Sequence, residues 1–75
     1  MDVAMDVKKV GAVLRTLREQ NNKSLDEAAA DLEVSKSALA MYERGERVPR
    51  DGVKVRIARY YNQSIQSIFF AEGEH

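Results

Sequence analysis

The fold is decided by residues 24–44, which read SLDEAAADLEVSKSALAMYER. This stretch opens with Ser24, and Glu27 follows three positions later. A serine hydroxyl and a glutamate carboxylate at this spacing can each accept a hydrogen bond from the backbone N–H of the other residue, which is the capping box of a helix N-terminus. We therefore expect a short, alanine-rich helix from Leu25 to Leu32.

A second helix is predicted after the short link at residues 33–34, because Ser35 is another good N-cap residue. This helix should run to about Arg44. Gly45 is typical of the position that follows a helix, and Pro49 cannot continue one. The stretch thus predicts two short helices joined by a tight turn.

Two helices joined so tightly need a small residue where they cross, and Ala29 provides it. The positions that such a pair buries are all apolar or amphipathic: Ala28, Leu32, Val34, Leu39 and Tyr42. Two ordinary packed helices would explain this apolar spacing, but not the small crossing residue together with both caps. The pattern therefore favours a helix-turn-helix motif over that alternative.

Further helices are predicted on both sides of the motif. The first runs from about Val7 to Asn21, and its apolar residues share one helix face: Val10, Val13, Leu14 and Leu17. The fourth, capped by Asp51, runs from Gly52 to about Tyr61 and should bury one of its two tyrosines together with Val55, Ile57 and Ala58. Ser64 caps a last helix, Ile65 to Phe70.

The sequence predicts an all-α fold of five helices over residues 7–70, between flexible tails at 1–6 and 71–75. A chain of 75 residues can hold one modest core, and this one has no cysteine for a disulfide or a zinc site. No apolar run is long enough to cross a bilayer, and the first residues are acidic, so we expect a cytoplasmic protein. Its 12 Lys plus Arg balance 12 Asp plus Glu, which argues mildly against a nucleic-acid partner unless the cations gather on one face.

Six segments carry a resemblance to a known family: LRTLR at 14–18, SLDEAA at 24–29, VSKSAL at 34–39, YERGERVP at 42–49, IARYY at 57–61 and SIQSIF at 64–69. In this order and spacing they resemble the phage-repressor and Cro-like helix-turn-helix family, also called the xenobiotic-response-element (XRE) family. The resemblance implies a five-helix, lambda-repressor-like fold whose third helix lies in the major groove of double-stranded DNA.

The sequence departs from the family pattern at four positions. Leu25 stands where a glutamine often touches DNA, so that contact should be absent. Glu33 stands at a turn position that favours glycine, because its backbone is left-handed. Ala28 implies a thinner core in the second helix, and Gly52 implies a loose start of the fourth.

A recognition helix presents its first residues and one outward stripe to base edges, and here these are Lys36, Ser37, Ala40 and Met41. Lys36 can donate to guanine, Ser37 can bond several bases, and Ala40 or Met41 can pack on a thymine methyl. The alternatives are that Lys36 touches only phosphate, that Ser37 only supports the helix start, and that Met41 fills the core or is simply exposed.

Phosphate contacts are expected from donors beside this helix: Lys23, Ser35, Arg44, Arg47 and Arg50. The resemblance also implies a partly buried ion pair between Glu43 and Arg18. Such a pair would pin the third helix to the first and remove one negative charge from the DNA-facing surface. The alternative is two independent surface charges.

The last helix and the end of the fourth are expected to supply a homodimer interface, because the apolar residues of the last helix exceed what one face can bury. The interface residues are Tyr61, Ile65, Phe69 and Phe70. Dimers would bind two half-sites about one DNA turn apart. The alternative is that these residues plug the core of the monomer.

The predicted function is a sequence-specific transcription regulator, a repressor, that reads a palindromic operator. The competing hypothesis is a protein-interaction module, such as an antirepressor or an assembly subunit, with a regulatory protein as its partner. The acidic residues of the second helix read as a solvated face, and the sequence has no metal-ligand cluster, nucleophile with a base, or phosphate-binding glycine loop. We expect no enzymatic activity, cofactor, small-molecule ligand or membrane partner.

Overall fold

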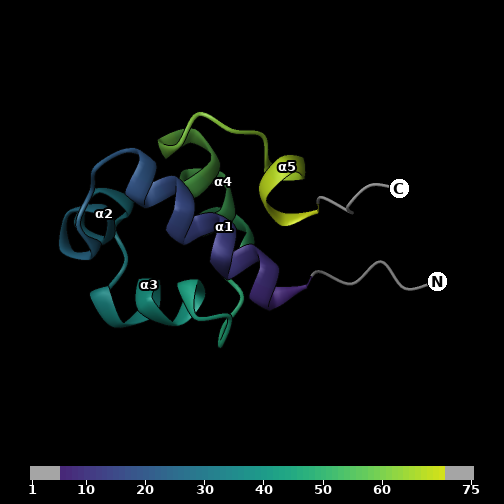
Figure 1. Ribbon diagram of the computed structural model, residues 1–75, viewed down its shortest axis with the longest axis horizontal. Coiled ribbons are helices and arrows are strands. Elements are labelled where there is room, and N and C mark those ends of the chain that lie inside the picture. The colour runs from purple at the N-terminus through teal and green to yellow at the C-terminus, as the bar shows by residue number, and fades with distance from the viewer. Residues whose placement is uncertain (1–5, 71–75) are drawn as a thin grey trace.

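Five helices account for most of residues 6–70, which are the part of the chain that this computed structural model describes. They are α1 (Val7–Gln20), α2 (Leu25–Leu32), α3 (Lys36–Glu43), α4 (Asp51–Tyr60) and α5 (Ile65–Phe69). Figure 1 shows α2 and α3 at one end of the molecule, α5 at the other, and α1 running between them. The all-α fold is confirmed. Of the predicted tails, residues 1–5 and 71–75 lie outside the described residues, whereas Asp6 belongs to the fold.

Side-chain caps fix where four of the helices begin. Asp6, Ser24, Ser35 and Ser64 each accept a hydrogen bond from the backbone N–H three residues later. The capping box at Ser24 is complete, since the Glu27 carboxylate also accepts from the Ser24 N–H at 2.9 Å. The predicted cap of α4 is wrong: Asp51 is the first residue of that helix, and Arg50 precedes it without a side-chain cap.

A residue with left-handed backbone sits in the link between helices at each tight turn. Glu33, between α2 and α3, has φ 62° and ψ 41°, as its turn position predicts. Asn22 and Asn62 have φ 55° after α1 and α4. Asparagine tolerates this conformation, but glutamate adopts it at a cost of roughly 1–2 kcal/mol. The turn of the helix-turn-helix is therefore a strained point of the chain.

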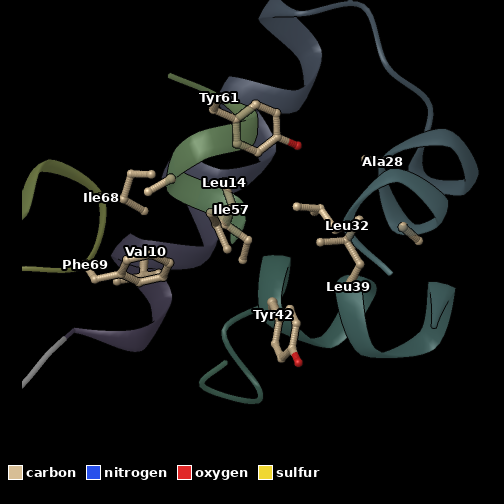
Figure 2. Packing of buried hydrophobic residues seen from close by; sticks show 12 residues of the cluster. Val10, Leu14, Ala28, Leu32, Leu39, Tyr42, Ile57, Tyr61, Ile68 and Phe69 are labelled. Carbon is tan, nitrogen blue, oxygen red and sulfur yellow. The ribbon is translucent and has the colours of Figure 1, made fainter. Parts of the chain in front are cut away.

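The core gathers side chains from all five helices, as Figure 2 shows. Its largest fully buried members are Leu14, Leu32, Leu39, Ile57 and Phe69. The register of two helices differs from expectation. Val13 is 38% exposed. On α4, Val53 and Val55 are both half-buried, and Val53 packs against the core in place of the expected Val55. Of the two tyrosines, Tyr61 is the buried one. Within residues 6–70 no helix combines the length and apolar character needed to span a bilayer.

Candidate nucleic-acid interface

Helix α3 has one face in the core and one in solvent. Leu39 and Tyr42 face inward and are 1% and 7% exposed. The opposite stripe begins with Lys36 and Ser37, which are both exposed, as the base-contact prediction requires. One turn later Ala40 and Met41 are half-buried. The rotation of the helix is thus set by its apolar residues, and the polar start of the stripe remains accessible to a ligand.

The predicted ion pair between Arg18 and Glu43 is present and mostly buried. Arg18 Nε donates to one carboxylate oxygen of Glu43 at 2.8 Å, and Nη2 donates to the other at 3.0 Å. The two side chains are only 15% and 6% exposed. The hydrogen bond to Glu43 is the main cause that raises the pKa of Arg18 above its usual value. Arg18 Nη1 also donates to the Lys23 carbonyl at 3.0 Å, so one guanidinium joins α1, α3 and the turn before α2.

A close approach of two backbones also fixes α3, which the sequence did not predict. Gly11, in the middle of α1, lies against the last turn of α3. A Cβ atom at Gly11 would lie 2.5 Å from the Glu43 carbonyl oxygen and 2.8 Å from that of Tyr42. Glycine inside a helix costs about 1 kcal/mol relative to alanine, which is the signal that marks such a contact. Gly11 therefore allows α1 to support α3 directly.

Two polar contacts from α4 hold helix α2 in place, and the sequence did not reveal them. Arg56 Nε donates to the Leu32 carbonyl at 2.9 Å, which satisfies a backbone acceptor at the end of α2. The Tyr60 hydroxyl donates to the Asp31 carboxylate at 2.6 Å. Burial, and to a lesser extent this hydrogen bond, raises the pKa of Tyr60 above its ordinary value. These contacts fix the helix that crosses α3.

Charged residues around the outward stripe include both signs. Lys36 Nζ lies 3.3 Å from the Asp26 carboxylate on α2. Arg44 donates to both carboxylate oxygens of Glu46, at 3.0 and 3.1 Å. This bond is the largest cause that lowers the pKa of Glu46 and raises that of Arg44. Two of the predicted DNA-contacting cations are therefore paired within the chain.

The remaining phosphate candidates lie in the links between helices α1 to α4. Ser35, Arg47 and Arg50 are exposed, and Lys23 is half-buried. The Ser35 oxygen accepts from the Ala38 N–H at 3.0 Å, which leaves its hydroxyl hydrogen able to donate.

Leu25, in the position that often holds a glutamine, packs against the core. It also lines a cleft between α1 and α3 together with Arg15, Arg18, Ala40, Glu43 and Arg44. This leucine is therefore a packing residue at the edge of the interface rather than a donor to DNA.

The structure corrects the predicted dimer surface. Tyr61 and Phe69 are 6% and 1% exposed and belong to the core of the monomer, so they cannot meet a second copy in this conformation. Ile65 is half-buried, and Phe70 is 41% exposed. The Lys54 ammonium lies 5.8 and 5.4 Å from the ring centres of Phe69 and Phe70. Among the described residues, no group of three or more His, Cys, Asp or Glu side chains could hold a metal ion.

A family model for the helix-turn-helix domain matches residues 9–66, which cover α2, the left-handed turn and α3 together with most of the supporting helices. The chain belongs to this family. The resemblance to the XRE family is thereby confirmed, and α2 and α3 are the two helices of the motif. No curated protein sequence matches the chain.

Several solved structures share the fold of this helix-turn-helix protein. The restriction-modification controller protein C.AhdI from Aeromonas hydrophila superposes with a TM-score of 0.79 and 25% identity, over 85% of this chain and 97% of that one. The DNA-binding domain of BldD from S. venezulae gives 0.73 and 26%, over 85% and 96%. An HTH_3 family transcriptional regulator from Vibrio cholerae gives 0.74 and 30%, over 84% of this chain and 35% of that longer one. By name, these three structures are a controller protein, a DNA-binding domain and a transcriptional regulator.

Proposed function

We propose that this protein is a sequence-specific transcription regulator, a repressor, whose α3 reads a palindromic operator in the major groove. The observation that carries the proposal is the exposed start of α3, where Lys36 and Ser37 project from a helix fixed by the buried Arg18–Glu43 pair. Lys36 can donate to O6 and N7 of guanine, and Ser37 can bond to several base edges. The names of the similar structures support the same function.

Repression follows from occupancy. A domain bound over a promoter blocks transcription by excluding other proteins, which needs no surface beyond the DNA-binding one. Lys23, Ser35, Arg44, Arg47 and Arg50 are proposed to position the domain on phosphates, and Ala40 and Met41 to pack on bases. We place this action in the cytoplasm of a bacterial cell, on chromosomal or phage DNA.

We expect a dimer because one small domain makes too few contacts for tight binding. A two-fold dimer presents two recognition helices about 34 Å apart, so its operator should be a palindrome. The proposed interface is the exposed edge of α5, Phe70 with the accessible part of Ile65. Sedimentation of Phe70→Glu tests this surface. A dimer that persists in the variant contradicts the assignment.

The central experiment is selection from random duplex DNA at 50 mM salt, followed by titration of the selected site. We expect a palindromic site whose affinity is lost in Lys36→Ala/Ser37→Ala and kept in Arg59→Ala, a matched cation on the exposed side of α4. If no sequence is enriched, the regulator proposal fails. The pairing of Lys36 and Arg44 with carboxylates would then favour the second candidate, a module that binds a regulatory protein.

A further inference from the structure

Two carboxylates hold the cations that the proposed interface needs. Lys36, the only charged residue in the base-reading stripe, lies 3.3 Å from Asp26. Arg44, at the other end of α3, donates two hydrogen bonds to Glu46. The first pair joins α2 to α3, and the second closes over the end of α3. Before DNA binds, the cation at each end of α3 is therefore already paired with a carboxylate.

Neither pair is placed to stabilise the fold. The side chains of Lys36 and Asp26 are 60% and 74% exposed, and those of Arg44 and Glu46 are 57% and 52% exposed. Exposed ion pairs are screened by water and salt and contribute little to folding. The structural pair of this protein is instead Arg18–Glu43, whose side chains are 15% and 6% exposed. The exposed pairs therefore contribute little to the fold, and their main effect is on the charge that this surface presents to a ligand.

We propose that Asp26 and Glu46 compete with DNA phosphate for Lys36 and Arg44, and so lower the affinity of this protein for non-operator DNA. The inference rests on the proposed function. Non-specific binding is driven by release of the cations condensed on DNA, and the number released follows the number of phosphates that the protein neutralises. A lysine or arginine that stays on its own carboxylate neutralises no phosphate. The two carboxylates thus withdraw two cations from the non-specific complex.

An operator changes this balance for Lys36. A guanine edge offers two acceptors to its ammonium, at a position that random sequence supplies only by chance. Genomes offer a very large excess of non-operator sites, which sequester a regulator in proportion to its non-specific affinity. A protein that suppresses this affinity keeps more of its copies free to find the operator. The zero formal charge of the chain is consistent with a surface that offers few unpaired cations to DNA.

The salt dependence of binding measures the effect. For duplex DNA the logarithm of the binding constant falls with the logarithm of salt concentration with a slope of about −0.9 per neutralised phosphate. Each freed cation should steepen that slope by about 0.9. Between 50 and 200 mM salt, this is a further loss of affinity of about 3.5-fold per cation.

The experiment is an anisotropy titration of a random-sequence duplex with the full chain between 50 and 200 mM salt. Asp26→Asn and Glu46→Gln should each steepen the slope by about 0.9 and tighten binding at 50 mM salt, and the double variant should show about twice the change in slope. Asp31→Asn is the matched control. It lies on α2 and adds the same unit of charge, but its partner is the Tyr60 hydroxyl, so it frees no cation.

A double-variant cycle tests whether Asp26 acts through Lys36. In the Lys36→Ala background, Asp26→Asn should leave the slope unchanged. Equal slopes for the wild type, Asp26→Asn and Glu46→Gln would overturn the inference while leaving the regulator proposal intact. An equal shift in Asp31→Asn would also overturn it, because net charge alone would then explain the effect. If the wild type binds no duplex at 50 mM salt, the proposed function and this inference fail together.

Discussion

Replacing Gly11 by alanine is the sharpest test of how α3 is positioned. Helix propensity predicts that this change raises the free energy of unfolding, whereas the tertiary structure predicts that it lowers it. Propensity alone predicts that alanine in the middle of α1 stabilises the protein by about 1 kcal/mol. In the structure, the new Cβ atom would lie 2.5 Å from the Glu43 carbonyl oxygen and 2.8 Å from that of Tyr42, whereas ordinary contacts begin at 3.4 Å. Both obstacles are backbone atoms, so α1 and α3 must separate by about 1 Å.

We expect a net loss of about 2 kcal/mol for Gly11→Ala, since overpacking of this kind typically costs about 1–3 kcal/mol and the shift also disturbs the neighbouring ion pair. For a domain of this size the loss lowers the Tm by about 8–16 °C. Thermal unfolding followed by circular dichroism measures it. The matched control is Gly52→Ala on exposed α4, where no atom lies within 4 Å of the new Cβ. The control should gain about 0.5 kcal/mol. A Tm of Gly11→Ala at or above that of the wild type would refute the close approach.

Three further predictions concern buried or strained groups. Glu43→Gln should cost about 3 kcal/mol in unfolding experiments, because it leaves the Arg18 charge without a counterion at a site where both side chains are largely buried; a cost below about 1 kcal/mol would mean that the pair is effectively a surface pair. Glu33→Gly should raise the free energy of unfolding by about 1 kcal/mol, because relief of the left-handed backbone outweighs the entropy that glycine loses on folding. A lower Tm would contradict this. Tyr61→Phe should be neutral or stabilising by about 1 kcal/mol, because the buried hydroxyl has no hydrogen-bond partner among the described residues. Burial raises the pKa of Tyr61 from 10 to about 12. Between these pH values the folded state keeps the proton and the unfolded state releases it, so the free energy of unfolding falls as the pH rises. This fall should be less steep in Tyr61→Phe than in the wild type. Parallel pH profiles of the two proteins would contradict that assignment.

Local chemistry made the helix boundaries predictable. Ser24 with Glu27 and Ser35 each present an oxygen to a nearby backbone N–H, and such bonds depend only on residues three positions apart. The left-handed turn at Glu33 was instead predicted from the family resemblance, which places a position that favours glycine there. The choice of Leu39 and Tyr42 as inward residues likewise follows from helical periodicity.

Contacts between distant segments were harder to predict. The Arg18–Glu43 pair was reached through resemblance, because residues 25 positions apart leave no periodic signal. The approach of α1 to α3 at Gly11 and the bond from Arg56 to α2 left only weak traces in the sequence. At Phe69 the apolar pattern was read correctly, but it could not tell the core of one chain from an interface between two.

The division of α3 into an inward and an outward side has an evolutionary consequence. Leu39, Tyr42 and Glu43 bind the helix to the rest of the domain, whereas Lys36 and Ser37 are exposed. Mutations at the outward positions therefore escape the stability threshold that removes most changes in small proteins. Under the proposed function, a duplicated copy of this gene can acquire a different target sequence through a few substitutions while its scaffold stays intact. The same property makes the outward stripe a suitable place for a randomised library.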